Sequence, residues 1–380
     1  MKDHTEQKIY SYLKEHEEEI LEDILTLVKA ESPSTDKAAV DACAEVLRAL
    51  YRKRLGETPE VIPREKSGNC LRLRLGKGEK KLMLLGHFDT VHPIGTVPIR
   101  REGDCLYGPG VIDMKGGDVL IIWAIKALRE LGYPLNKRVT IVHNGDEEIG
   151  SRSSREVIEK EAEDSTACLV AETATDGPAQ IKTARKGNVV IRVRCTGKAA
   201  HAGNSPQEGI NANIELAHQI LFLEGLTSPE RNMTLSVTLI SGGTKANVVS
   251  DYAEATVCMR YPKTEDMDWV KEQILARKPV LPGAKVEFEW LVGRPPMEAT
   301  AKTRELFRLA EVIGEELTLQ VIEAPIAGGV SDGNFVANKG VPVLDGLGAP
   351  GPGAHNPQEH MIISQLVPRG ALLAGLIRQI

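Results

Sequence analysis

The segment Lys80-Lys-Leu-Met-Leu-Leu-Gly-His-Phe-Asp89 (KKLMLLGHFD) runs from a continuous apolar stretch directly into polar residues. A run of this kind is typical of a strand that is buried on both faces of a sheet. His87 and Asp89 follow where the strand should end, and residues two apart on a strand share a face. A carboxylate beside a histidine orients the ring as metal-binding histidines require. Taken alone, a histidine hydrogen-bonded at a strand end is the simpler interpretation.

Helical and strand-like patterns alternate around this segment. Residues 36–55 and 118–131 have helical patterns, whereas 138–144 and 167–172 read as strands. This alternation predicts an α/β domain with a mixed, largely parallel sheet and helices on both faces. The first 29 residues predict one long amphipathic helix, and they lack the apolar core of a signal peptide.

The pattern changes near residue 186. The next elements are strand, helix, strand, strand, helix and strand, at residues 187–197, 210–226, 234–243, 251–262, 264–278 and 284–291. This βαββαβ order is that of a ferredoxin-like α+β module. The α/β pattern returns from about residue 294. We therefore expect one catalytic domain made of residues 1–184 and 294–380, interrupted by an inserted domain at 185–293.

Composition excludes several classes of function. A net charge of −6 argues against nucleic acid or an anionic membrane as a partner, because both favour basic surfaces. No apolar run approaches the roughly 20 residues that a membrane-spanning helix needs. The six cysteines contain no C-x-x-C pair, so they are expected to be reduced thiols of a cytoplasmic protein.

Further acids and a histidine follow the predicted strands or lie in the loops after them. They are Asp113 in YGPGVIDMKGG, Glu147 and Glu148 in NGDEEIG, Glu172 in CLVAETA and His355 in GAHNPQEH. Each could be a helix cap, a turn acid or a loop residue. Together they gather where open α/β sheets place their ligand sites. Two histidines with several carboxylates suit zinc, cobalt or manganese, and their number fits two metals that share one carboxylate.

These motifs, with GHFDTV and GKAAHAGNSPQEGINAN, resemble a family of zinc-dependent exopeptidases. The family includes glutamate carboxypeptidase, aminoacylase, acetylornithine deacetylase and succinyl-diaminopimelate desuccinylase, and the resemblance is closest to glutamate carboxypeptidase. It covers nearly the whole chain, in order. The resemblance implies two Zn²⁺ ions, for which Co²⁺ or Mn²⁺ could substitute. His87 and Glu172 would hold one ion, Glu148 and His355 the other, and Asp113 would bridge them.

The resemblance also implies catalytic roles. Asp89 would orient His87, and Glu147 would be the general base that passes a proton from water to the leaving amine. The residues themselves support the second role, because the neighbours Glu147 and Glu148 cannot present their side chains in the same way. A base must stand off the metal, whereas a ligand must touch it. The family pattern also predicts a cis peptide bond between Asp113 and Met114.

In the inserted domain, the resemblance implies substrate-binding residues and a homodimer. His201 would reach the active site of the partner subunit and stabilise the oxyanion, and Asn247 would hydrogen-bond substrate. Arg260 would pair with a substrate carboxylate. Arg294, where the chain returns to the catalytic domain, is a further candidate for binding this carboxylate. The inserted domain would therefore serve as a lid and for dimerisation. Gln180 stands where the family pattern places a lysine that meets an acidic side chain, and Lys182 could substitute for it.

The expected activity is hydrolysis of an amide bond in a small peptide or N-acyl amino acid. A carboxypeptidase that releases a C-terminal, glutamate-like residue is the first hypothesis. An N-acyl amino acid deacylase or a dipeptidase is the alternative within this chemistry. From other classes, a catalytically silent metal-binding dimerisation protein would have lost a ligand or Glu147, and a two-metal phosphohydrolase would need basic phosphate clamps.

Overall fold

The computed structural model of the protein describes residues 4–175 and 177–380. The chain forms two compact units. Unit 1 comprises Met1–Thr183, Ala299–Ala327 and Ser331–Ile380, and unit 2 comprises Ala184–Glu298 and Gly328–Val330. Arg185 and Met297 exchange backbone hydrogen bonds of 2.9 and 3.0 Å, which keep the returning chain with unit 2. Unit 1 is thus assembled from chain segments on both sides of unit 2.

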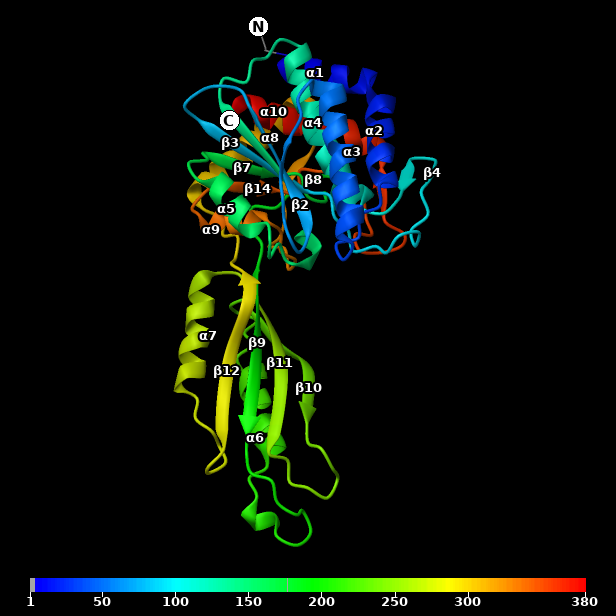
Figure 1. Cartoon of the computed structure of the whole chain (residues 1–380). Coiled ribbons are helices and arrows are strands. Elements are labelled where there is room, and N and C mark those ends of the chain that lie inside the picture. The colour runs from blue at the N-terminus through cyan, green and yellow to red at the C-terminus, as the bar shows by residue number, and fades with distance from the viewer. Residues whose placement is uncertain (1–3, 176) are drawn as a thin grey trace. The chain divides into compact units, whose positions relative to one another are not determined.

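A six-stranded mixed sheet forms the centre of unit 1 (Figure 1). Its strands, in spatial order, are β1 (Glu60–Ile62), β2 (Gly68–Leu75), β6 (Arg138–Gly145), β3 (Lys81–His87), β7 (Ala167–Val170) and β14 (Val343–Asp345). The last four strands are parallel to one another, whereas β2 is antiparallel to both β1 and β6. The predicted mixed, largely parallel α/β sheet is confirmed, and the carboxyl ends of β3, β6 and β7 share one edge.

Helices surround this sheet because each buries an apolar face in the core of unit 1. One core contains residues of α1 (Thr5–Glu15), α2 (Glu17–Lys29), α3 (Lys37–Leu55), α4 (Gly116–Glu130), α8 (Ala301–Leu317) and α10 (Leu366–Gln379). Helix α4 is apolar on nearly all sides and is correspondingly buried. Two shorter helices, α5 (Arg155–Ala162) and α9 (Gly333–Asn338), pack against each other and against the sheet, apart from this group (Figure 1).

The single N-terminal helix expected from the sequence is wrong: the structure has two helices that break at His16. His16 has φ −106° and ψ 14°, and its amide donates to Leu13 O in a tighter turn. Its ring Nδ1 lies 2.8 Å from Tyr12 O and competes for that helical carbonyl. The apolar face predicted on both sides of the break is nonetheless buried, from Ile9 to Val28.

Short strands that the sequence pattern did not reveal tie distant segments together. One pair is β8 (Ala179–Ile181) with β13 (Val321–Glu323). A second small sheet joins β15 (His360–Ile362), β5 (Cys105–Tyr107) and β4 (Arg100–Glu102). The second sheet holds the chain after His355 beside the chain before Asp113.

Unit 2 has the predicted βαββαβ order. Its elements are β9 (Gly187–Thr196), α6 (Ala212–Glu224), β10 (Thr234–Gly242), β11 (Tyr252–Tyr261), α7 (Thr264–Ala276) and β12 (Lys285–Arg294). The strands lie in the order β10-β11-β9-β12, each antiparallel to its neighbours, which confirms the ferredoxin-like topology (Figure 1). One face packs on both helices, and the other carries ion pairs of Arg192 and Arg194 with Glu289.

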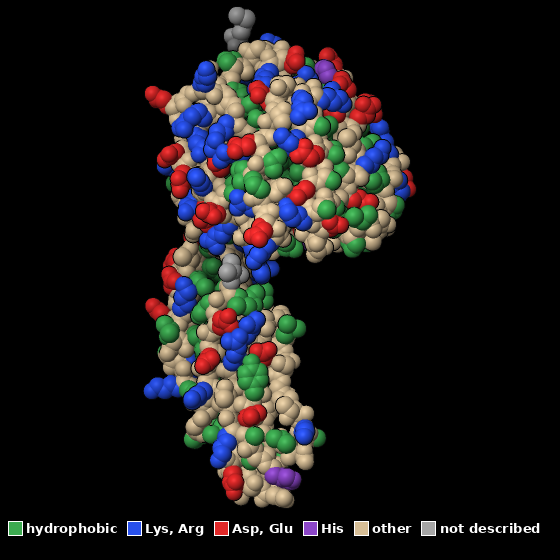
Figure 2. Space-filling view, viewed as in Figure 1, with side chains coloured by type: hydrophobic (Ala, Val, Ile, Leu, Met, Phe, Trp, Pro, Cys, Tyr) green, Lys and Arg blue, Asp and Glu red, His purple; other side chains and the backbone are tan. Residues whose placement is uncertain are grey.

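The surface of unit 1 carries charges of both signs, interspersed over the face that Figure 2 shows. None of the helices within residues 4–175 and 177–380 combines the length and the apolar character needed to cross a bilayer.

Candidate metal centre

The predicted ligands of unit 1 converge at the carboxyl edge of the parallel strands. His87 is the last residue of β3 and lies opposite Asn144 of β6. Glu147 and Glu148 follow β6 in the short 3-10 helix η2 (Glu147–Ile149), and Glu172 follows β7. The register of the sheet therefore places these acids beside His87.

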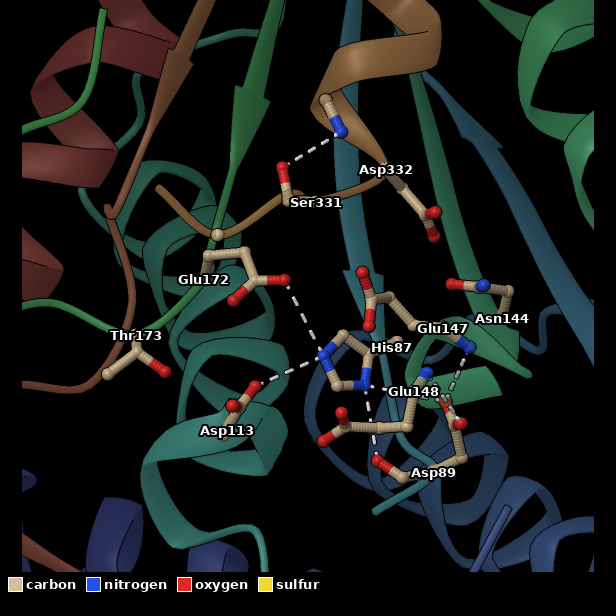
Figure 3. Close-up of polar contacts among 12 residues, drawn as sticks. His87, Asp89, Asp113, Asn144, Glu147, Glu148, Glu172, Thr173, Ser331 and Asp332 are labelled. Carbon is tan, nitrogen blue, oxygen red and sulfur yellow. Dashed lines mark hydrogen bonds and ion pairs between the residues drawn. The ribbon is translucent and has the colours of Figure 1, made fainter. Parts of the chain in front are cut away.

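His87 faces carboxylates on both sides of its ring (Figure 3). Its Nε2 atom lies 3.2 Å from Asp113 Oδ1 and 3.6 Å from Glu172 Oε1. Its Nδ1 atom lies 3.1 Å from Asp89 O and 3.4 Å from Asp89 Oδ1. His87 is 1% exposed. Nε2 is thus directed at two acids, while Nδ1 is held by Asp89.

Asp113 lies between the two predicted histidine ligands. Its Oδ1 faces His87, and its Oδ2 lies 3.2 Å from His355 Nε2. The same His355 nitrogen lies 3.0 Å from Glu148 Oε2. One ligand atom each from His87, Asp113 and Glu148 lies within 4.8 Å of the others. The peptide bond after Asp113 is cis, which confirms the prediction for Asp113–Met114.

The histidines and acids of this cluster shift one another's pKa values. Burial lowers the pKa of His87, but the neighbouring carboxylates of Asp113, Asp89 and Glu172 outweigh it, so that this pKa lies well above its ordinary value. Asp113 and Glu148 raise the pKa of His355 to about 11. Burial raises the pKa of Glu148, whereas the two histidines hold the pKa of Asp113 below its usual range despite burial. The acids therefore favour positive charge at both histidine positions.

The residues present fit a divalent cation. Among the described residues, His87 Nε2 is buried and has no hydrogen-bond partner of acceptable geometry, although two carboxylates face it. The donor atoms are imidazole nitrogen and carboxylate oxygen, a set suited to zinc and related metals.

Asp89 connects the histidine to the acidic turn. It is fully buried and accepts hydrogen bonds from Glu147 N (3.1 Å), Glu148 N (3.2 Å) and Ser34 Oγ (2.7 Å). The two glutamates turn their carboxyl groups to different sides (Figure 3), and Glu147 is 8% exposed. A single buried carboxylate therefore sets the position of the His87 ring and of the turn after β6.

Two further acids close to the predicted ligands have structural partners. Asp146 Oδ2 accepts a hydrogen bond from Ser153 N at 2.8 Å, and its carbonyl accepts one from Ser151 N, so that it shapes the turn. Glu359 is fully buried and accepts hydrogen bonds from the backbone amides of Gly110, Ile112 and Asp113. In the sequence, Glu359 lies in a Gly- and Pro-rich loop, four residues after His355, and nothing in this context indicates that the acid is buried.

The four predicted residues of unit 2 form two pairs at opposite ends of its sheet. His201 is exposed, and its Nδ1 accepts bonds from two following amides; its neighbour Ala202 donates to Asn247 O at 2.9 Å. Arg260 and Arg294 both lie opposite Asn188, one on each side of it. Asn188 is near the start of β9, whereas His201 follows its end. Their functional roles stay predictions.

The chain is similar to known peptidases and deacetylases. The model of peptidase family M20/M25/M40 matches residues 83–379. Carboxypeptidase G2 of Pseudomonas sp. (strain RS-16) is 31% identical over 369 residues, which cover 94% of this chain and 88% of that protein. An acetylornithine deacetylase of Vibrio campbellii is 30% identical over 197 residues, half of each chain.

Solved structures share the fold. Aminopeptidase PepT of Bacillus cereus superposes with a TM-score of 0.78 at 21% identity, covering 95% of this chain and 98% of that one. The YXEP protein of Bacillus subtilis, described as a dinuclear metal-binding peptidase, gives 0.70 at 17% identity, with 96% and 98% covered. With a family model that spans most of its length and a relative at 31% identity, the chain belongs to the metallopeptidase family M20/M25/M40.

Proposed function

We propose that this protein is a dinuclear zinc carboxypeptidase that releases a C-terminal amino acid, glutamate-like in character, from a peptide or N-acyl amino acid. The observation that carries the proposal is the placement of Asp113 between His87 and His355, with one carboxylate oxygen facing each imidazole. A carboxylate in this position is suited to bridging two cations.

The proposed ligands would divide into two sets around Asp113. His87 and Glu172 would hold one Zn²⁺, and Glu148 and His355 the other, with Co²⁺ or Mn²⁺ as substitutes. When bound, two such cations would polarise the amide carbonyl and lower the pKa of water towards neutrality. Asp89 orients His87 through its Nδ1 atom.

Glu147 is the proposed general base. Its carboxyl group is nearly buried and turned away from that of Glu148, while its amide is fixed by Asp89 (Figure 3). It takes a proton from the attacking water and delivers it to the nitrogen of the leaving amino acid. Transfer by a positioned carboxylate contributes about 10²–10⁴-fold to such reactions.

Substrate recognition is assigned to unit 2. Arg260 and Arg294 flank Asn188, and guanidinium groups suit the C-terminal carboxylate of a peptide. Similarity to carboxypeptidase G2 over nearly the whole chain supports release of a C-terminal residue. Lys182, which could substitute for a lysine at position 180, already donates from Nζ to Thr173 O at 2.7 Å within unit 1.

Deacylation of an N-acyl amino acid is the second candidate function, supported by the similarity of half the chain to acetylornithine deacetylase.

We include a homodimer in the proposal because His201 lies too far from Arg260 in one chain for both to bind the same substrate. Strand β9 has ten residues, so the Arg260 end and the His201 end of unit 2 are separated by on the order of 30 Å. A dipeptide cannot bridge that distance. Residues from both ends can serve one site only if two chains supply them. Strand β10 is an edge strand whose Leu239 and Ile240 are 67% and 66% exposed, which suits pairing with a second copy.

We further propose a cytoplasmic location, where thiols stay reduced. All six cysteines are free thiols, and burial raises the pKa of Cys43, Cys70, Cys168 and Cys195. Raised pKa values keep these side chains protonated and unreactive.

The test is a hydrolysis screen of dipeptides and N-acyl amino acids that vary in the C-terminal residue, with zinc added, for wild type and Glu147→Gln. We expect glutamate-like C-terminal residues to be preferred and the variant to lose at least about 10²-fold in kcat with unchanged zinc content. Glu156→Gln, an exposed acid on α5, is the matched control and should keep full activity. Full turnover by Glu147→Gln would refute the mechanism, and a wild type inactive on every substrate would favour a silent metal-binding protein.

A further inference from the structure

A buried carboxylate outside the proposed ligand set collects four hydrogen-bond donors. Glu359 is 0% exposed. Its Oε1 accepts from Ile112 N at 2.9 Å and Asp113 N at 3.2 Å. Its Oε2 accepts from Gly110 N at 3.1 Å and contacts His92 Nε2 at 2.9 Å. Each oxygen therefore has two partners, which offsets the cost of burying a charge.

Three of these donors belong to the short backbone segment that presents Asp113. Gly110 has φ 72°, and a Cβ atom there would meet Thr90 Cγ2 at 2.5 Å, so the segment is closely fitted. Glu359 fixes the direction of three amide groups in this backbone segment. The third of these amides belongs to Asp113 itself, so fixing it also fixes where the two carboxylate oxygens of Asp113 lie.

Glu359 also belongs to the loop that carries His355. The loop is closed on itself: Asn356 N donates to Gly353 O, and Glu359 N donates to Asn356 O, both at 2.9 Å. The amide of Gln358 donates to Asn356 Oδ1 at 2.9 Å. These hydrogen bonds hold His355 in a fixed position relative to Glu359. The Nε2 atom of His355 lies 3.2 Å from Asp113 Oδ2.

The fourth donor extends the connection to the segment after β3. His92 is 6% exposed and follows His87 and Asp89 in the same stretch of chain. Through His92, the Glu359 carboxylate joins three segments that carry proposed ligands, 87–92, 110–113 and 355–359. Two of them precede unit 2 in the sequence and one follows it.

We propose that Glu359 is a positioning residue for metal binding, which fixes Asp113 and His355 relative to each other, and that His92 holds Glu359 in place. The inference rests on the proposed metal centre. Glu359 touches neither metal nor substrate. It acts by preorganising the ligands, so its loss should weaken metal affinity by about 10–100-fold, as is usual for groups that orient ligands.

The test compares Glu359→Gln with Asp104→Asn. Asp104 is a matched control because it too is an acid that ties the first part of unit 1 to the last, accepting bonds from Ser364 N and Ser364 Oγ, but away from the ligands. Metal-free wild type and variants are titrated with Co²⁺, and the visible absorption of the bound ion is recorded. Thermal unfolding of the metal-free chains measures stability separately.

We expect Glu359→Gln to bind Co²⁺ about 10–100-fold more weakly, with an altered spectrum, and Asp104→Asn to bind as wild type does. Wild-type affinity and spectrum in Glu359→Gln, or an equal loss in both variants, would overturn the role of Glu359. A wild type that takes up no Co²⁺ would overturn the metal centre itself and this role with it.

A second pair of variants guards against a Glu359→Gln chain that does not fold. His92→Ala removes one donor of four and should weaken Co²⁺ binding by about tenfold or less. His92→Gln restores an N–H donor and should recover most of that loss. Equal affinity of His92→Ala and wild type, or no recovery in His92→Gln, would contradict the connection through His92.

Discussion

Two substitutions on different chains should restore an active site if His201 acts across a dimer. Glu147→Gln removes the proposed base in unit 1, and His201→Ala removes the proposed oxyanion donor in unit 2. Each homodimer should be inactive or nearly so. A mixed dimer with one substitution on each chain combines the intact unit 1 of one chain with the intact His201 of the other.

The expected magnitude follows from counting sites. In a twofold dimer each unit 1 uses the partner's His201, so this mixed dimer has one intact site and one doubly damaged site, and roughly half of wild-type activity per dimer. The structural reason is the length of β9, which separates the Arg260 end of unit 2 from its His201 end. Residues so far apart in one chain cannot meet at one small substrate.

The assay uses co-expressed chains with two affinity tags, so that only mixed dimers are purified. The reciprocal arrangement, both substitutions on one chain and none on its partner, is the control. Action across the dimer predicts activity near zero for this control, whereas action within one chain predicts about half. Half activity in the control together with none in the first mixed dimer would refute the reasoning.

Three further predictions follow from unit 1. Gly86→Ala places a Cβ atom 2.2 Å from Asp118 Oδ1, so it should cost about 1–3 kcal/mol in urea unfolding instead of the usual gain from removing a glycine; stability equal to wild type would contradict this contact. Removal of metal by a chelator should lower the Tm. Zinc added at a hundred times its Kd should then raise the free energy of unfolding by about 2.7 kcal/mol; a Tm that neither treatment changes would argue against the metal centre. Arg72 and Arg74 outweigh burial and hold the pKa of Glu161 below its ordinary value, so this stabilisation is present above about pH 4.3 and is lost as pH falls through the lowered pKa. Glu161→Gln should therefore flatten the acid limb of the stability profile measured by urea unfolding, and an unchanged limb would contradict the pairing.

The meeting of the proposed ligands was predictable because strand order and strand ends are visible in a sequence. The apolar run before His87 and the runs before Glu147 and Glu172 are each long enough to mark a strand, and parallel strands bring their carboxyl ends to one edge. The βαββαβ order of unit 2 was also predictable, from strands in which apolar and polar residues alternate and from the helical patterns between them.

Features set by contacts between distant segments were not predictable. The break at His16 depends on a side chain that competes for one carbonyl, and periodicity across the break is preserved. The burial of Glu359 arises only when residues far apart in sequence fold together. The separation of His201 from Arg260 was present in the strand pattern, but the register of β9 and β11 was needed to show that they lie at opposite ends.

The division of unit 1 by unit 2 also sets the timing of assembly during synthesis. His87, Asp113, Glu148 and Glu172 are made first, and His355 follows Glu172 by roughly 180 residues, which a ribosome needs on the order of ten to forty seconds to add. Throughout that interval the nascent chain holds a partial ligand set without its second histidine or the Glu359 loop. Unit 2, whose elements are contiguous, can fold in the meantime. The proposed metal centre would therefore be complete only after both halves of unit 1 have closed on each other.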